Sequence, residues 1–247
     1  MISEPEQHGD EPILSVDERK AVSGGRWFAS LSPSLRHDIL RLAYVRRYAD
    51  GELIFARGDP CETWCACAKG AVRVSSTSVS GKLVTLTYLE PGAWFGDVSI
   101  FDVDRHMHDT YAHGDTTVLC VARADLEKIL SMHVELYEAL LRLQSRRIRG
   151  LFGLVEDLNT LPLRARLARQ LIHQVRSYGV PSLSDANHVR IGLQLAQEEM
   201  AQLLGASRQR VNQELKAMER EGAIRVEPEG LVVLDRAALR RISDDDE

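Results

Sequence analysis

The segment from Ala196 to Glu219 constrains the fold more than any other part of this sequence. It reads AQEEMAQLLGASRQRVNQELKAME. Ala201 is small, as close crossing of two helices requires, and Gly205 suits a turn that needs a positive φ. Ser207 can cap a second helix, which then has an apolar face formed by Val211, Leu215 and Met218. This spacing predicts a helix-turn-helix.

The opposite face of the second helix carries side chains suited to DNA. Arginine, glutamine and asparagine have geometries that match base edges in the major groove. The alternative is a helical hairpin whose charged face is only solvated, as such faces usually are. The predicted DNA-binding residues are Ser207, Arg208, Gln209, Arg210, Asn212 and Gln213.

The region around this motif is also consistent with DNA binding. Residues 223–234 read as two short strands around Pro228, Glu229 and Gly230, which predicts a wing. The chain has a net charge of −5, yet residues 163–241 carry 13 Lys/Arg against 9 Asp/Glu. A locally basic module suits nucleic acid because affinity depends on charge close to the phosphates.

The middle of the chain has a different sequence pattern. Residues 46–122 form short β-rich runs punctuated by glycine, which predicts a compact all-β sandwich or barrel. Residues 1–25 are polar without a sustained period and are interpreted as a flexible arm. A short helix is expected over residues 33–44, with Ser32 as its cap. The glycines between the runs are Gly51, Gly58, Gly70, Gly81, Gly92 and Gly96.

A long helix is expected over residues 126–160. Its apolar residues recur in heptads, which predicts a seam that pairs two copies of the chain. The alternative is a helix packed on its own β-domain, and Phe152 and Leu154 lie off the seam. Pro162 ends this helix and is expected to open the next one, over residues 163–178. The predicted dimer interface consists of Val134, Tyr137, Leu141, Gln144, Ile148, Leu151, Val155 and Leu158.

Several classes of protein are disfavoured. No apolar run approaches the roughly 20 residues of a membrane span, and the N-terminus does not resemble a secretion signal, so we expect a cytoplasmic protein without membrane contact. No nucleophile–base arrangement or phosphate loop stands out, so we expect no enzyme and no catalytic residue. The cysteines fit no common metal pattern and are interpreted as buried reduced thiols: Cys61, Cys65, Cys67 and Cys120.

From Trp27 to Leu239 the layout resembles the family of the cyclic-AMP receptor protein and the fumarate-and-nitrate-reduction regulator. The most specific matches are the glycines, the phrase PGAWFGD at 91–97 and LGASRQRV at 204–211. The resemblance implies an α+β fold. An N-terminal β-roll, a jelly roll like that of cyclic-nucleotide-binding domains, senses an effector over residues 26–125. A dimerisation helix follows over 126–160, then a winged helix-turn-helix over 161–241 and an acidic tail over 242–247.

The same resemblance implies partners. It implies a homodimer that binds a palindromic operator in double-stranded DNA and acts with RNA polymerase. A small-molecule effector would bind between the β-roll and the long helix and reorient the DNA-binding domains about a hinge at residues 157–162. The alternative is a nucleotide-binding regulatory module that does not bind DNA.

The expected effector pocket departs from the family's cyclic-AMP sensors. Asp97 replaces the glutamate that holds the ribose, and the Arg-Ser pair that holds the phosphate is missing near His106 and Met107. Losing a guanidinium–phosphate contact costs about 1.5–3 kcal/mol, so we expect weak cyclic-AMP binding. Leu151 and Phe152 stand where a polar pair would meet the adenine. The candidate effector residues are Gly96, Asp97, Arg105, His106, Met107, Leu151 and Phe152.

The identity of the effector stays open. The arginines at 142, 146, 147 and 149 can meet a cyclic dinucleotide or form a solvated, salt-bridged face. The histidines at 106, 108 and 113 can bind a metal or haem, or belong to a polar loop, which we favour, so no metal site is predicted. An iron–sulfur cluster is disfavoured because no cysteine precedes Cys61. Gln209 and Gln213 replace the family's Glu and Arg, which predicts a shifted DNA half-site.

Overall fold

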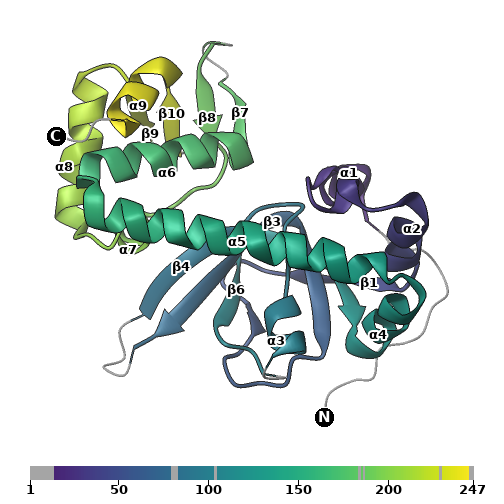
Figure 1. The fold of residues 1–247 in the computed structure, drawn as a ribbon. Helices are drawn as coiled ribbons and strands as arrows, with labels where there is room; N and C mark the ends of the chain where they lie inside the picture. The colour runs from purple at the N-terminus through teal and green to yellow at the C-terminus, as the bar shows by residue number, and fades with distance from the viewer. Residues whose placement is uncertain are drawn as a thin grey trace. The chain divides into compact units, whose positions relative to one another are not determined.

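The computed structural model describes residues 14–78, 83–102, 105–182, 185, 187–227 and 230–244. The chain divides into two compact units, residues 1–74 with 88–144 and residues 75–87 with 145–247. The order of elements along the chain, labelled in Figure 1, confirms the predicted α+β class: a β-domain, a long helix and a helix-turn-helix. The predictions for residues 1–13, 81, 104, 228–229 and 245–247 lie outside the described residues.

The β-domain is built on a six-stranded sheet. Its strand order is β1-β6-β3-β4, with β2 paired to β6 and β5 paired to β3. Strands β1 and β6 are antiparallel from Ala43 opposite Val121 to Tyr48 opposite Thr116. The strands are β1 (Ala43–Tyr48), β2 (Leu53–Phe55), β3 (Thr63–Thr77), β4 (Leu83–Leu89), β5 (Trp94–Phe95) and β6 (Asp109–Ala122).

Two apolar clusters fill this domain. In the first, the rings of Trp64 and Trp94 lie 4.1 Å apart, and Phe28 stacks on Trp94 at 5.3 Å. The second contains Cys65 and Cys120, whose sulfur atoms lie 3.3 Å apart. All four cysteines are buried and free, as predicted. Burial raises the pKa of the Cys67 thiol to about 12, so this thiol stays protonated.

The structure differs from the sequence prediction at the N-terminal arm. Residues Val16–Gly24 form helix α1, which opens with a capping box between Ser15 and Glu18. Glu18 is buried and accepts a hydrogen bond from the Thr117 hydroxyl of β6 at 2.6 Å. Burial raises the pKa of Glu18, but the hydrogen bonds from Thr117 and Ser15 outweigh it and hold the pKa below its usual value. These contacts anchor residues 15–24, the part of the predicted arm that contains α1.

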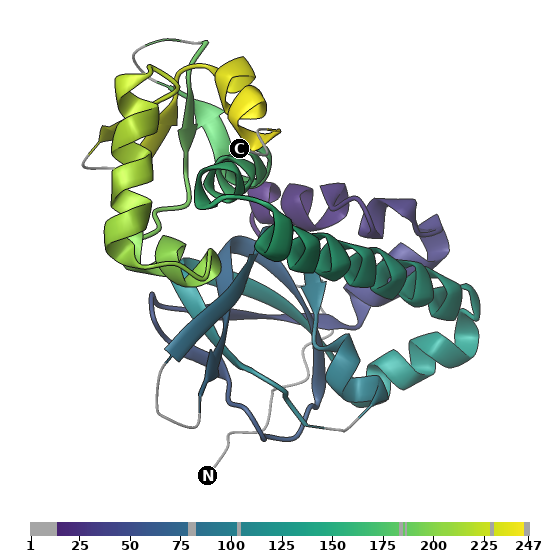
Figure 2. The same cartoon turned by 60° about the vertical axis from the view of Figure 1, so that its left-hand side comes forward.

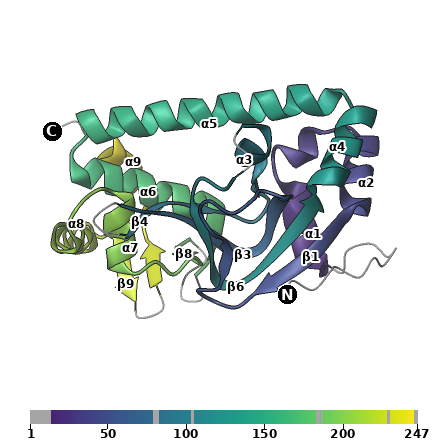
Figure 3. The same ribbon diagram turned by 90° about the horizontal axis from the view of Figure 1, so that it is seen from below.

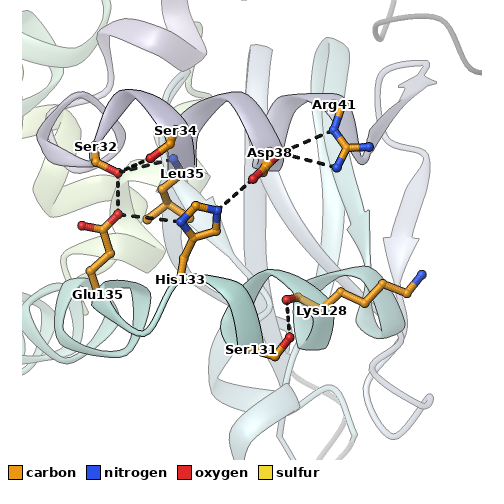
Figure 4. Close-up of polar contacts among 9 residues, drawn as sticks. All are labelled: Ser32, Ser34, Leu35, Asp38, Arg41, Lys128, Ser131, His133 and Glu135. Carbon is orange, nitrogen blue, oxygen red and sulfur yellow. Dashed lines mark hydrogen bonds and ion pairs between the residues drawn. The ribbon is translucent and has the colours of Figure 1, made fainter.

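Helix α2 (Pro33–Arg41) confirms the predicted helix with its Ser32 cap. The short 3-10 helix η1 (Phe28–Ser30) precedes it. As Figure 4 shows, α2 is tied to the end of α4 (Arg123–Met132): the Asp38 carboxylate lies 2.8 Å from His133 Nε2, and Ser32 donates to Glu135. The hydrogen bond from His133 holds the pKa of Asp38 below its usual value.

The predicted long helix is interrupted at its start. Helix α4 ends at Met132 and α5 runs over Glu135–Thr160, an unbroken helix that Figure 3 shows along its length. His133, with φ −125° and ψ 78°, is non-helical and is held by Asp38. The prediction of one continuous helix from residue 126 is therefore wrong. Val134 directly precedes α5 and is exposed, and its place on the dimer seam stays a prediction.

The second unit contains a four-stranded sheet flanked by helices. Its strand order is β7-β8-β10-β9, and β9 and β10 form the predicted wing. Figure 2 shows α8 as a straight helix beside this sheet. Helix α6 begins at Leu163, with Pro162 as the residue before its first turn. The elements are α6 (Leu163–Tyr178), β7 (Gly179–Pro181), β8 (Val189–Ile191), α7 (Gln197–Leu203), α8 (Arg208–Arg220), β9 (Ile224–Glu227), β10 (Gly230–Val233) and α9 (Arg236–Ser243).

Candidate nucleic-acid interface and effector site

Helices α7 and α8 form the predicted helix-turn-helix. Gly205 stands in the turn with a φ of 59°, a backbone conformation that glycine adopts without steric cost. The Ser207 hydroxyl accepts a hydrogen bond from the Arg210 amide at 3.3 Å and so caps α8. The side chains predicted to face the core are buried: Ala201, Val211, Leu215 and Met218.

The turn is held in place from α6. Arg166 donates to the carbonyl oxygen of Leu204 at 2.7 Å, next to Gly205. Arg164 pairs with Glu221 beyond the end of α8 and lies 3.8 Å from Glu214. These contacts tie the turn before α8 and the C-terminal half of α8 to α6.

The polar face of α8 is accessible. Ser207, Arg208, Gln209, Arg210 and Gln213 are exposed, and Asn212 is half-buried. An open hollow of about 510 Å³ at the start of the helix brings four of the predicted residues together with Gln197 of α7, which the sequence analysis did not single out. Arg210 and Gln213 do not line this hollow. Its lining residues are Gln197, Ser207, Arg208, Gln209 and Asn212.

Of the candidate effector residues, Leu151 and Phe152 lie on α5 in the second unit, whereas Gly96 and Asp97 lie at the start of α3 (Asp97–Phe101) in the first unit. Gly96 precedes this helix with a φ of 91°, and a Cβ atom there would lie 2.8 Å from the carbonyl oxygen of Thr63, so only glycine fits. Asp97 is buried, and its carboxylate accepts a hydrogen bond from the Gln144 amide of α5. This side chain therefore contacts its own β-domain, and its place on the dimer seam stays a prediction.

The residues at the expected phosphate-binding segment have different surroundings. Arg105 donates to the carbonyl oxygen of Gly58 at 2.6 Å, and Met107 is exposed. His106 is buried, and its ring stacks on Phe55 with centroids 4.1 Å apart. Burial lowers the pKa of His106, which favours the neutral ring. Leu151 and Phe152 are exposed on α5.

The histidines show no shared geometry for a metal. His106 stacks on Phe55, whereas the ring of His113 packs edge-on against Tyr88. Burial, with the charge of Arg57, lowers the pKa of His108. Among the residues that the structure describes, no three His, Cys, Asp or Glu side chains lie close enough together to hold a metal ion.

Helix α5 has two different apolar faces. Leu136 and Leu140 are buried against the β-domain, and the indole of Trp27 donates to the carbonyl oxygen of Ala139 at 2.8 Å. The other face is exposed, with Leu141 at 67% and Ile148 at 51% of full accessibility. One face of the helix thus packs on its own β-domain, and for the other face pairing with a second copy stays a prediction. The exposed seam residues are Tyr137, Leu141, Ile148, Leu151, Val155 and Leu158.

An ion pair crosses the expected hinge. Arg169 of α6 lies 2.5 Å from the Asp157 carboxylate near the end of α5 and also donates to the carbonyl oxygen of Ser243. The segment between the two helices is therefore braced by a side chain from each.

Two family models match the chain, one in each part. The cyclic nucleotide-binding domain matches residues 45–133, and the Crp-like helix-turn-helix domain matches residues 165–242. No helix in the described ranges combines the length and apolarity that a membrane crossing needs.

Similar proteins cover almost the whole chain. The "Cyclic AMP receptor protein" of Thermus thermophilus is 30% identical over 90% of this chain and 98% of its own length. The "CRP-like cAMP-activated global transcriptional regulator" of Mycobacterium tuberculosis is 28% identical over 92% of this chain and 99% of its own. The structure of FixK2 from Bradyrhizobium japonicum is similar in fold, with a TM-score of 0.71 and 22% identity over 81% of this chain and 96% of that one.

Proposed function

Because the chain belongs to the family of the cyclic-AMP receptor protein and the fumarate-and-nitrate-reduction regulator, we propose that it acts as a homodimer on a palindromic DNA operator. It is a DNA-binding transcription regulator with an effector-binding domain, as the matches to both domain families indicate. The observation that carries the proposal is the capped helix α8, with a buried apolar face and exposed Arg208, Gln209 and Gln213. RNA polymerase is a further expected partner, and the cytoplasm the expected location.

Pairing through α5 is supported by its exposed apolar residues. Leu141, Ile148 and Val155 are spaced at heptad intervals and are each more than half exposed. When a second copy packs against a stripe of this kind, the apolar side chains are removed from contact with water, which stabilises the dimer. Dimerisation would also present two α8 helices to the two halves of a palindrome.

The effector is proposed to be a small molecule other than cyclic AMP bound in its usual way. The Thermus and Mycobacterium relatives carry names that refer to cyclic AMP, which favours a nucleotide as the class of effector. In this chain, however, Asp97 already accepts from Gln144, and Arg105 is engaged with the Gly58 carbonyl oxygen. A cyclic nucleotide would have to displace Gln144 from Asp97, and it would find no Arg-Ser pair to hold its phosphate.

A cyclic dinucleotide is the second candidate effector. It carries two phosphates, and the α5 arginines lie on one stretch of helix. Arg142 is already paired with Glu138 at 2.5 Å, whereas Arg146 and Arg149 are exposed. These two arginines would therefore be the first to meet phosphate.

Two measurements on the purified full-length protein test the proposal. Fluorescence anisotropy with labelled genomic fragments at one fixed salt concentration should reveal fragments bound far more tightly than a scrambled control. Titration calorimetry should give a cyclic-AMP dissociation constant above the micromolar range. Binding to every fragment alike would contradict the regulator function, and a submicromolar constant for cyclic AMP would contradict the proposal on the effector.

A further inference from the structure

Asn212 is positioned by a side chain from the neighbouring helix. Gln197, the first residue of α7, donates through its Nε2 to the Oδ1 of Asn212 at 3.3 Å. Both side chains are half-buried, and both line the hollow at the start of α8 beside Arg208 and Gln209. The contact therefore lies within the surface that carries the predicted base-reading residues.

In the structure, this hydrogen bond directs one end of the Asn212 amide, the Oδ1 atom, at Gln197. An asparagine side chain has an acceptor, Oδ1, and a donor, the Nδ2 amide, on opposite sides. Since Oδ1 is directed at Gln197, the donor is the end that remains for DNA. Within the described ranges, Nδ2 of Asn212 has no hydrogen-bond partner.

We propose that Gln197 determines base specificity at one position of each half-site by holding the donor end of Asn212 outward. This inference rests on the proposed function, which places α8 in the major groove. An asparagine free to use both ends pairs with adenine through its N6 and N7 atoms. Held in this orientation, Asn212 favours a base edge that accepts, best met by guanine O6 and N7 or thymine O4, over cytosine, whose N4 amino group only donates; adenine presents both an acceptor, N7, and a donor, N6.

Replacing the amide of Gln197 with a carboxylate should reverse this choice. A glutamate at this position can only accept, so the Asn212 amide turns to donate to it and presents Oδ1 to the DNA. An outward acceptor selects cytosine N4 or adenine N6. The preference for an accepting over a donating base at this position should change by about tenfold or more.

The experiment is binding-site selection from random DNA with the full-length protein at one fixed salt concentration. Wild type, Gln197→Glu and Gln194→Glu are compared, after thermal melting shows that each variant is folded. Gln194→Glu introduces the same charge three residues earlier in the chain, at a side chain that does not line the hollow. We expect Gln197→Glu to change one base position per half-site, and Gln194→Glu to leave the selected motif as in wild type.

Asn212→Ala, alone and combined with Gln197→Glu, identifies the residue through which Gln197 acts. Discrimination at the same position should be lost in Asn212→Ala, and adding Gln197→Glu should then change nothing further. A Gln197→Glu motif identical to wild type, or a uniform loss at all sequences as expected for a phosphate contact, overturns the inference. If Arg208→Ala still alters the motif in that case, only the role of Gln197 fails. If Arg208→Ala alters nothing either, the placement of α8 fails as well.

Discussion

His106, a candidate effector residue, is expected to make the stability of the protein depend on pH. The ring is buried on Phe55, and burial lowers its pKa, an effect that the nearby charge of Asp59 opposes only in part. Below a pH of about 6.5 the unfolded histidine binds a proton that the folded one resists. The free energy of unfolding should therefore fall as the pH drops below 6.5, by at most about 1.4 kcal/mol per pH unit from this residue, until the folded pKa is reached.

The variant His106→Gln should lose part of this dependence. Urea unfolding of wild type and variant at pH 7.5 and pH 5.5 measures it, with the exposed His37→Gln as the matched control. The loss of stability between the two pH values should be smaller for His106→Gln than for wild type, and unchanged for His37→Gln. Equal losses in all three proteins would show that His106 does not titrate differently in the folded state.

Arg208 is expected to contribute most to specific affinity. It is exposed in the first turn of α8, where an arginine can make a bidentate contact with guanine worth roughly 1–3 kcal/mol. Arg208→Ala should weaken specific binding by about ten- to a hundredfold. Non-specific binding, carried mostly by phosphate contacts, should weaken much less.

Arg220→Ala serves as the control, since Arg220 is exposed at the opposite end of the same helix. Anisotropy titrations with an operator and with scrambled DNA separate the two kinds of binding. An equal loss on both DNAs for Arg208→Ala would mean that Arg208 contacts phosphate rather than a base.

At the scale of elements, the exposed face of α5 predicts the oligomeric state. Changing Leu141, Ile148 and Val155 together to glutamate should give monomers, because charged side chains cannot be buried in a seam without partners. Loss of dimers should also abolish tight operator binding. Light scattering at micromolar concentration measures the mass, and Leu154→Glu, an exposed apolar position off the seam, is the control. A monomeric wild type would contradict the interface.

The elements that local residues define could be predicted from the sequence. The caps at Ser32 and Ser207 and the turn at Gly205 depend on side chains or backbone angles at those positions, and all three are observed. The break at His133 could not be predicted in this way, because no proline or glycine marks it. It depends on the contact with Asp38, 95 residues earlier in the chain. Helix α1 was missed because its sequence is polar, and its anchor, Glu18, binds Thr117.

At the candidate sites too, local patterns could be predicted from the sequence, whereas contacts between distant residues could not. The heptad pattern predicted which face of α5 is exposed but not the contact of Gln144 with Asp97, since periodicity does not reveal which residue of the β-domain lies opposite the helix. The spacing of α8 predicted the candidate base-reading residues, whereas Gln197 belongs to another helix and meets them only through the fold. Contacts between residues that are far apart in the sequence could therefore be found only in the structure.

At the scale of the whole molecule, the proposed function combines two properties: the chain forms a dimer, and it reads DNA through α8. Two recognition helices related by twofold symmetry read an inverted repeat, with half-sites about one helical turn of DNA apart or a multiple of it. This geometry links the seam on α5 to the form of the operator.

The most direct test is binding-site selection with the wild-type protein from random DNA at a single salt concentration. Parallel selections contain no added ligand, cyclic AMP or a cyclic dinucleotide, so that a requirement for an effector does not hide binding. We expect an inverted repeat with half-site centres about 10 base pairs apart, or a multiple of that spacing, in at least one selection. Enrichment of a single unrepeated site, or of no motif under any condition, would contradict it.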